Sequence, residues 1–195
     1  MPVAGLPAKT APAVEKMLTA LRSRGFSLIE LMIAISIFVL LVVLAGPMYG
    51  EFMANTNIRN AGESMLNGLR LAQAQAVRSN LPTLFTYTGT GWSVTTDDPD
   101  NPGTPLFQED YLLTQGANQA TLTETPSGAT TVTFGGLGRV EANANASASL
   151  ELLDIKNPAV SASRPLRIVI ANSTSAIGTK LCDPAVPASE PQACP

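Results

Sequence analysis

The feature that most constrains this chain is an apolar run close to its N-terminus. From Leu31 to Gly50 the sequence LMIAISIFVLLVVLAGPMYG contains no charged residue. About 20 helical residues rise roughly 30 Å, which is enough to cross the hydrocarbon core of a bilayer. The preceding residues 1–24 carry one acid, Glu15, against four cations, Lys9, Lys16, Arg22 and Arg24. This bias predicts that the N-terminal end stays in the cytoplasm and that the rest of the chain crosses the membrane.

A single carboxylate, Glu30, stands at the leading edge of this apolar segment. A charge inside a membrane costs a few kcal/mol even on lenient insertion scales, so we expect Glu30 to have a partner. Cleavage between Gly25 and Phe26 would create one. The new α-ammonium group of Phe26 would lie about one helical turn from Glu30, in the same or a neighbouring subunit.

The segment Arg24-Gly25-Phe26-Ser27-Leu28-Ile29-Glu30 resembles the signature of type IV prepilins, in which a basic leader ending in glycine precedes phenylalanine, three residues, glutamate and an apolar run. The resemblance implies that a membrane aspartyl peptidase, the prepilin peptidase, cuts after Gly25 and methylates the new N-terminus at Phe26. The alternative is an ordinary secretory signal cleaved after Ala45. It is disfavoured because such signals have only roughly 7–15 apolar residues, and because it leaves Glu30 unexplained.

The composition narrows the function classes. The whole chain has a net charge of −3, and loss of the basic leader 1–25 would make the product more acidic. An acidic protein is a poor general binder of nucleic acid, although a local basic patch could still act. The chain has no histidine and two cysteines. We find no nucleophile with a matching base and no phosphate-binding glycine loop, so we expect neither an enzyme nor a bound cofactor.

One long helix is predicted from Phe26 to Ser79, within a segment 26–80 whose residues 26–50 span the membrane. Pro47 should kink or locally melt it, because proline removes a backbone hydrogen bond. Pilins commonly carry a proline at the corresponding place, so the resemblance implies a role for Pro47 in assembly. A tolerated membrane-helix proline would give the same kink without that role.

Beyond Pro47 the periodicity remains helical and becomes amphipathic. Apolar residues at spacings of three and four form one stripe that should face a core, namely Ile58, Ala61, Met65, Leu69, Ala72 and Ala76. Asn80, as a left-handed cap, and Pro82 should end the helix.

Residues 81–195 are predicted to form one small β-rich domain. The turn Gly89-Thr90-Gly91 predicts a hairpin of Thr83–Thr88 with Trp92–Thr96. Further strands are expected near Leu106–Leu113, Thr130–Phe134, Leu150–Ile155, Arg164–Ile170 and Ser175–Leu181, and Glu141–Ser149 should be an exposed loop or weak strand. The Asp97–Gly103 loop offers oxygen ligands but fits no EF-hand spacing, so we predict a solvated turn and no metal site.

Two internal segments are similar to the GspH/FimT group of minor pilins and pseudopilins. Leu69–Ser79 resembles that group's motif at the end of the helix, and Val132–Val140 matches its phenylalanine strand and glycine-arginine turn. The resemblance implies an α+β fold, in which a long N-terminal helix, transmembrane in its first half, packs on a small antiparallel β-sheet or sandwich of the type IV pilin kind.

The C-terminal tail contains both cysteines, Cys182 and Cys194, on the translocated side of the membrane, where an oxidising compartment permits a disulfide. Two free thiols are the alternative. A proline-rich tail closed by cysteines resembles the FimT side of the group, the minor pilins of type IV pili, more than the secretion pseudopilins.

Some FimT-type proteins bind DNA through two arginines just before the first tail cysteine. Here one lysine, Lys180, stands in that stretch, and Arg164 and Arg167 could add to a patch. Phosphate contacts add up charge by charge, so we expect solvated surface charge in preference to DNA binding.

The resulting hypothesis is a structural minor pilin that primes or caps a type IV pilus. It would sit in the bacterial inner membrane as a single-pass protein with a periplasmic head until it enters the filament. Its partners would be other pilin or pseudopilin subunits, the prepilin peptidase and the inner-membrane assembly platform. The alternatives are a type II secretion pseudopilin and a minor pilin that binds DNA during natural transformation.

Overall fold

The computed structural model describes residues 25–101, 103–113, 117, 119–170 and 179–195. All of the predicted leader except Gly25, and most of the predicted strand Ser175–Leu181, lie outside these residues. The chain divides into two compact units, Met1–Ala45 and Gly46–Pro195. The second unit is the head, and it contains the later part of the long helix together with the strands.

The helix α1 (Leu28–Ser79) begins two residues after the predicted start and ends at the predicted residue. Ser27 caps its N-terminus, because its Oγ accepts a hydrogen bond from the Glu30 N–H at 3.2 Å. Asn80 has a φ of 53°, so the predicted left-handed cap is confirmed. Pro47 lies inside the helix, which is continuous through it, so the local melting that we considered does not occur.

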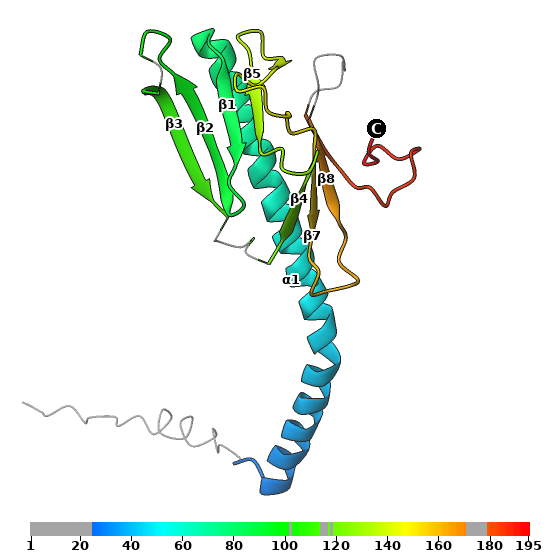
Figure 1. Ribbon diagram of the computed structural model, residues 1–195. Coiled ribbons are helices and arrows are strands. Elements are labelled where there is room, and N and C mark those ends of the chain that lie inside the picture. Colours follow the sequence, from blue (N-terminus) through cyan, green and yellow to red (C-terminus); the bar gives the residue numbers. More distant parts are fainter. Residues whose placement is uncertain (1–24, 102, 114–116, 118, 171–178) are drawn as a thin grey trace, which may run out of the picture. The chain divides into compact units, whose positions relative to one another are not determined.

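Two antiparallel sheets form the β part of the head (Figure 1). The first has the strand order β3-β2-β1-β5-β6 and the second the order β4-β7-β8-β9. The strands of the first sheet are β1 (Thr83–Tyr87), β2 (Gly91–Asp97), β3 (Pro105–Leu112), β5 (Thr131–Phe134) and β6 (Val140–Glu141). Those of the second sheet are β4 (Thr121–Thr125), β7 (Leu152–Lys156), β8 (Leu166–Val169) and β9 (Lys180–Cys182). The predicted α+β class and the predicted β1–β2 hairpin are confirmed.

The core lies where one face of α1 meets both sheets. All six residues of the predicted stripe are at most 1% exposed. They pack in one cluster with Phe85, Val94, Val132 and Phe134 of the first sheet and with Leu153, Ile155 and Ile168 of the second sheet. Each fully buried side chain of this size contributes roughly 1.5–3 kcal/mol relative to an exposed one, so this contact dominates the stability of the head.

Glycine allows α1 to approach the sheets closely. A Cβ atom at Gly68 would lie 2.6 Å from Cδ2 of Trp92 and 2.9 Å from Cε2 of Phe85. On the side of the second sheet, a Cβ at Gly62 would lie 3.1 Å from Cδ1 of Leu181. The contact at Gly68 involves rigid rings in the core, whereas the contact at Gly62 involves the end of a flexible side chain.

The sequence prediction was incomplete in three places. Strands β4 and β6 were not predicted. The expected strand Arg164–Ile170 is shorter, because Pro165 has no N–H and the Arg164 N–H donates to Oδ1 of Asn55 on α1 instead. The predicted exposed segment Glu141–Ser149 contains a buried residue, Asn143, whose Nδ2 donates to Thr131 Oγ1 at 3.0 Å and to Ser147 Oγ at 3.1 Å.

We expect Gly68→Ala to destabilise the head by about 1–2 kcal/mol, because overpacking against the two rings outweighs the better helix propensity of alanine. Gly62→Ala is the matched control. Since the Leu181 side chain can move, that variant should remain within about 0.5 kcal/mol of the parent or gain stability. Urea unfolding followed by the fluorescence of Trp92, the chain's single tryptophan, measures both. Equal losses in the two variants would contradict this account of the helix–sheet contact.

Candidate functional site

The N-terminal end of α1 holds the predicted processing residues. Gly25, Phe26 and Ser27 precede the helix in non-helical backbone, and the Phe26 side chain is 81% exposed. No heavy atom lies within 4 Å of a Cβ built at Gly25. Among the described residues, Gly25 and Phe26 are both exposed, as access by a peptidase would require.

Glu30 lies in the first turn of α1, where a carboxylate interacts favourably with the positive end of the helix dipole. Together with Ser27 it has the spacing of a capping box, a sequence signal that marks the start of the helix at Leu28. In the described part of the chain, no cation forms an ion pair with this carboxylate. A charge partner for Glu30 must therefore come from another molecule or from the part of the chain that is not described.

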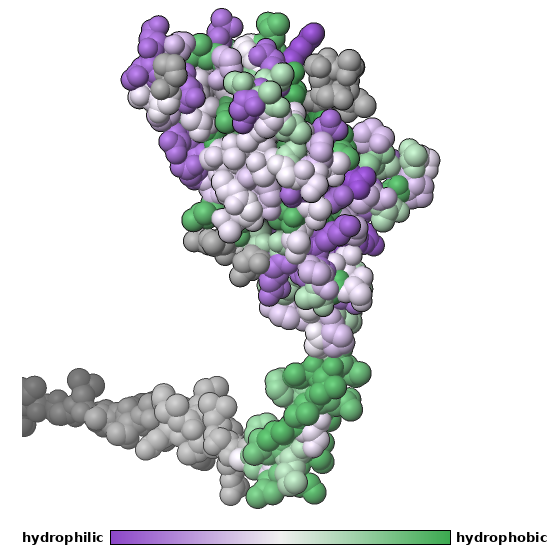
Figure 2. Space-filling view, in the orientation of Figure 1, coloured by the Kyte–Doolittle hydropathy of each residue, from purple (hydrophilic) through white to green (hydrophobic). Residues whose placement is uncertain are grey.

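The surface that follows Glu30 is apolar and exposed. Every residue from Leu28 to Met53 is exposed, and burial begins at Ala54, which is 1% exposed. Figure 2 shows this part of α1 as almost continuously hydrophobic, in contrast to the mixed surface of the head. By length and composition α1 could cross a membrane. The second half of the helix is covered by its own chain, whereas the apolar side chains of the first half have no cover from the described residues.

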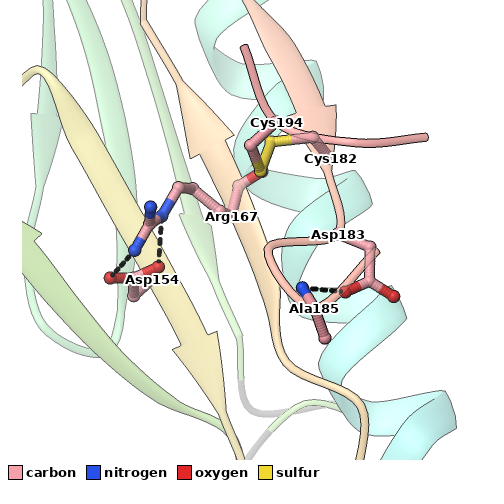
Figure 3. Close-up of polar contacts among 6 residues, drawn as sticks. All are labelled: Asp154, Arg167, Cys182, Asp183, Ala185 and Cys194. Atoms are coloured by element: carbon pink, nitrogen blue, oxygen red, sulfur yellow. Dashed lines mark hydrogen bonds and ion pairs between the residues drawn. A yellow bond between two sulfur atoms is a disulfide. The ribbon is translucent and has the colours of Figure 1, made fainter. Parts of the chain in front are cut away.

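The tail beyond β9 is held against the second sheet. Cys182 and Cys194 form a disulfide, which in the chain-entropy model is worth about 3 kcal/mol for a loop of this size. Lys180 Nζ donates to the carbonyl oxygen of Ala193 at 2.9 Å. Figure 3 shows the disulfide and the hydrogen bond of 2.8 Å from the Ala185 N–H to Asp183 Oδ1. The disulfide and these contacts keep the tail ordered beside β9.

Two of the three predicted DNA-binding cations already have partners. Arg167 on β8 donates to both carboxylate oxygens of Asp154 on β7, at 2.7 and 3.0 Å (Figure 3). Lys180 is engaged with the tail. Arg164 lines a groove of about 880 Å³ between α1 and the tail, where Glu51, Glu63 and Asp183 also lie. The three cations are therefore not gathered into one free basic patch, and DNA binding stays a prediction.

The Asp154–Arg167 pair is partly buried, with side chains 16% and 33% exposed. The hydrogen bonds from Arg167 lower the pKa of Asp154 below its usual value of 3.8. Because the native pKa is lowered, the pair stabilises the fold fully above the unfolded-state pKa near 3.8, and this contribution disappears as the pH falls through the lowered native value. Sequence reasoning missed Asp154, since cross-strand partners follow from a register that one sequence does not reveal.

We expect Asp154→Asn to destabilise the head by about 1–2 kcal/mol at neutral pH, because Arg167 loses a charge-assisted bidentate partner. The difference from the parent should shrink as the pH falls below 3.8. Glu63→Gln is the control, since it breaks the exposed Arg59–Glu63 pair at 2.8 Å and should cost at most about 0.5 kcal/mol. Urea titrations at several pH values test this, and a loss at Asp154 that did not depend on pH would contradict it.

Two family models match the sequence of this chain. The family model described as type II transport protein GspH matches residues 61–174, and the prokaryotic N-terminal methylation motif matches residues 21–46. The first match contains both segments that resembled the GspH/FimT group, and the second contains Gly25, Phe26 and Glu30. No curated protein sequence matches the chain significantly.

Two crystal structures of the type IV minor pilin FimU from Pseudomonas aeruginosa resemble the chain at 18% identity. One has a TM-score of 0.44 and covers 70% of this chain and 98% of FimU. The other has a TM-score of 0.40 and covers 70% and 94%. The GspH model matches more than half of the sequence, and the methylation motif accounts for the N-terminus. The chain is a type IV pilin-like protein and belongs to the GspH family.

Proposed function

We propose that this protein is a minor pilin that primes or caps a type IV pilus. In this role the apolar half of α1 anchors the subunit in the inner membrane, with its head in the periplasm, and later packs among the helices of neighbouring subunits. The prepilin peptidase would cut after Gly25 and methylate Phe26, and the inner-membrane assembly platform would move the subunit into the filament.

The observation that carries this proposal is the division of α1 at Ala54. Residues before it expose large side chains such as Phe38, Leu44 and Phe52, at 65–66% each, whereas the stripe after it is buried. Exposed apolar surface costs about 25 cal/mol per Å² in water, so the first half needs lipid or other apolar helices around it. A filament subunit is surrounded first by membrane lipid and then, after assembly, by the apolar helices of its neighbours.

Within this proposal, Glu30 determines how the helices of neighbouring subunits align. When α1 leaves the membrane for a filament core, its carboxylate is again surrounded by apolar side chains. An unpaired charge there would cost on the order of 3–5 kcal/mol, and the α-ammonium group of Phe26 from an adjacent subunit could neutralise it. The pairing would set the axial position of each new helix relative to its neighbour.

A second candidate is a pseudopilin of a type II secretion system, which has the same processing and the same use of α1. The description of the matching family model favours it. The cysteine-closed tail supports the pilus role, through its resemblance to the FimT side of the group. The two candidates differ in the machine that incorporates the subunit.

We expect Glu30→Gln to impair incorporation into filaments and to leave processing intact. Glutamine also suits the third position of a capping box, so this variant removes the charge and retains the start of the helix. Glu51→Gln is the matched control, because Glu51 is exposed and lies beyond Pro47. The measurement is the amount of the subunit in sheared filaments, assayed in the source bacterium.

Loss of the subunit from pili supports the proposed role, whereas a defect confined to type II secretion supports the second candidate. Normal incorporation of Glu30→Gln into either structure would contradict the charge pairing.

A further inference from the structure

Strand β3 forms a free edge of the first sheet. Within the residues that the structure describes, β3 pairs with β2 and no strand pairs with its other side. The Leu113 N–H donates to the Thr90 carbonyl. In an antiparallel pair every second residue is hydrogen-bonded to the same neighbour, so residues 107, 109 and 111 also direct their N–H and C=O groups to β2. The N–H and C=O groups of residues 108, 110 and 112 therefore point away from the sheet, whereas Leu106 lies at the register shift opposite Thr96 and Asp97. An unpaired edge of this length is a template for another strand.

The two faces of β3 differ in chemistry. On the outer face, Leu106 and Leu112 are 59% and 62% exposed. On the inner face, Glu109 and Tyr111 line a groove of about 560 Å³ between β3 and α1. A strand added to this edge would place alternate side chains over the two leucines and the others at the mouth of the groove.

The groove is suited to a cationic side chain. Its walls include Glu109 from β3 and Glu63 from α1, and Glu63 is already ion-paired with Arg59. Its lining includes Trp92, which stacks on both Phe85 and Tyr111 with centroids 6.2 and 5.5 Å apart and whose Nε1 donates to Ser64 Oγ at 3.1 Å. Tyr111, which is 44% exposed, is therefore the aromatic ring that an incoming cation can reach. Carboxylates next to aromatic faces attract ammonium and guanidinium groups by charge and by cation–π interaction. The edge therefore presents a row of unpaired backbone groups, an outer face on which Leu106 and Leu112 flank Gln108 and Asp110, and an acidic, aromatic inner face.

The chain does not supply the complement to this edge among its described strands. Pairing of β3 with β3 of a second copy would bring Glu109 and Asp110 close to their own counterparts, and like charges on paired strands are destabilising. Strand β4, at the edge of the second sheet, carries Glu124, so pairing it with β3 would also bring like charges together. Strand β9 is followed directly by the tail, which is tied to it by the disulfide and by the hydrogen bond from Lys180 to Ala193.

We propose that the free edge of β3 binds an extended segment of another protein by strand addition. The segment alternates apolar residues, which cover Leu106 and Leu112, with lysine or arginine, which enters the groove at Glu109. This site goes beyond the proposed filament role and does not rest on it, because it uses only the head and involves neither Phe26 nor Glu30.

The test is a titration of the full chain in non-ionic detergent micelles with the peptide acetyl-(Val-Lys)3-amide. Trp92 is the single tryptophan and lies in the groove, so its emission reports on the occupant. We expect a saturable change with the lysine peptide and none with the peptide that has glutamate in place of lysine. Glu109→Gln should weaken binding about fivefold, since it removes the groove's other carboxylate and leaves only Glu63, which is paired with Arg59.

Gln108→Pro and Gln108→Thr form the decisive pair. Both lose the Gln108–Asp110 side-chain hydrogen bond of 2.9 Å, but only proline removes the outward N–H, and neither disturbs the ladder to β2. We expect about tenfold weaker binding for Gln108→Pro and unchanged binding for Gln108→Thr. Equal binding by these two variants, equal binding of the two peptides, or no saturable change up to about 1 mM peptide would overturn the proposal.

Discussion

The burial of one stripe of α1 by two sheets at once is the contact on which the rest of the structure depends. Neither sheet has another helix to cover its inner face among the described elements. The stripe uses small residues beside large ones, with Ala61, Ala72 and Gly68 near Met65 and Leu69, so that both sheets reach the same short length of helix. The head therefore cannot form without the second half of α1, which ties the head to the half that needs other partners.

The sequence predicted the features that follow from local periodicity and local turn chemistry. The spacing of Ile58 to Ala76 identified the buried face of α1, Asn80 and Pro82 marked its end, and the glycines after Tyr87 indicated the β1–β2 hairpin. These signals act over a few residues, so the surrounding fold does not have to be known.

Features that depend on long-range register were not predicted. Strand β4 is polar and exposed at alternate positions, and β6 has two residues, so neither carries a strong pattern. Asp154 became the partner of Arg167 through the antiparallel register of β7 with β8. The acidic groove exists because β3 is the outermost strand of its sheet, and strand order does not follow from one sequence.

Charge is distributed differently at the two ends of α1. In the head, Arg167, Lys180 and the buried Asn143 all have hydrogen-bond partners within the chain. At the start of α1, no ion pair to the Glu30 carboxylate is formed within the described residues, and the Ser27 hydroxyl caps the Glu30 N–H. A carboxylate left open beside an apolar, exposed surface is the property expected of a group that is satisfied by a neighbouring molecule.

The account requires that Phe26 becomes the first residue of the chain, since the partner of Glu30 would otherwise not exist. Intact-mass measurement of the protein recovered from sheared filaments tests this most directly. The account predicts a chain that begins at Phe26 and carries one added methyl group. A protein that retains residues 1–25, or one that begins at Gly46, would contradict it.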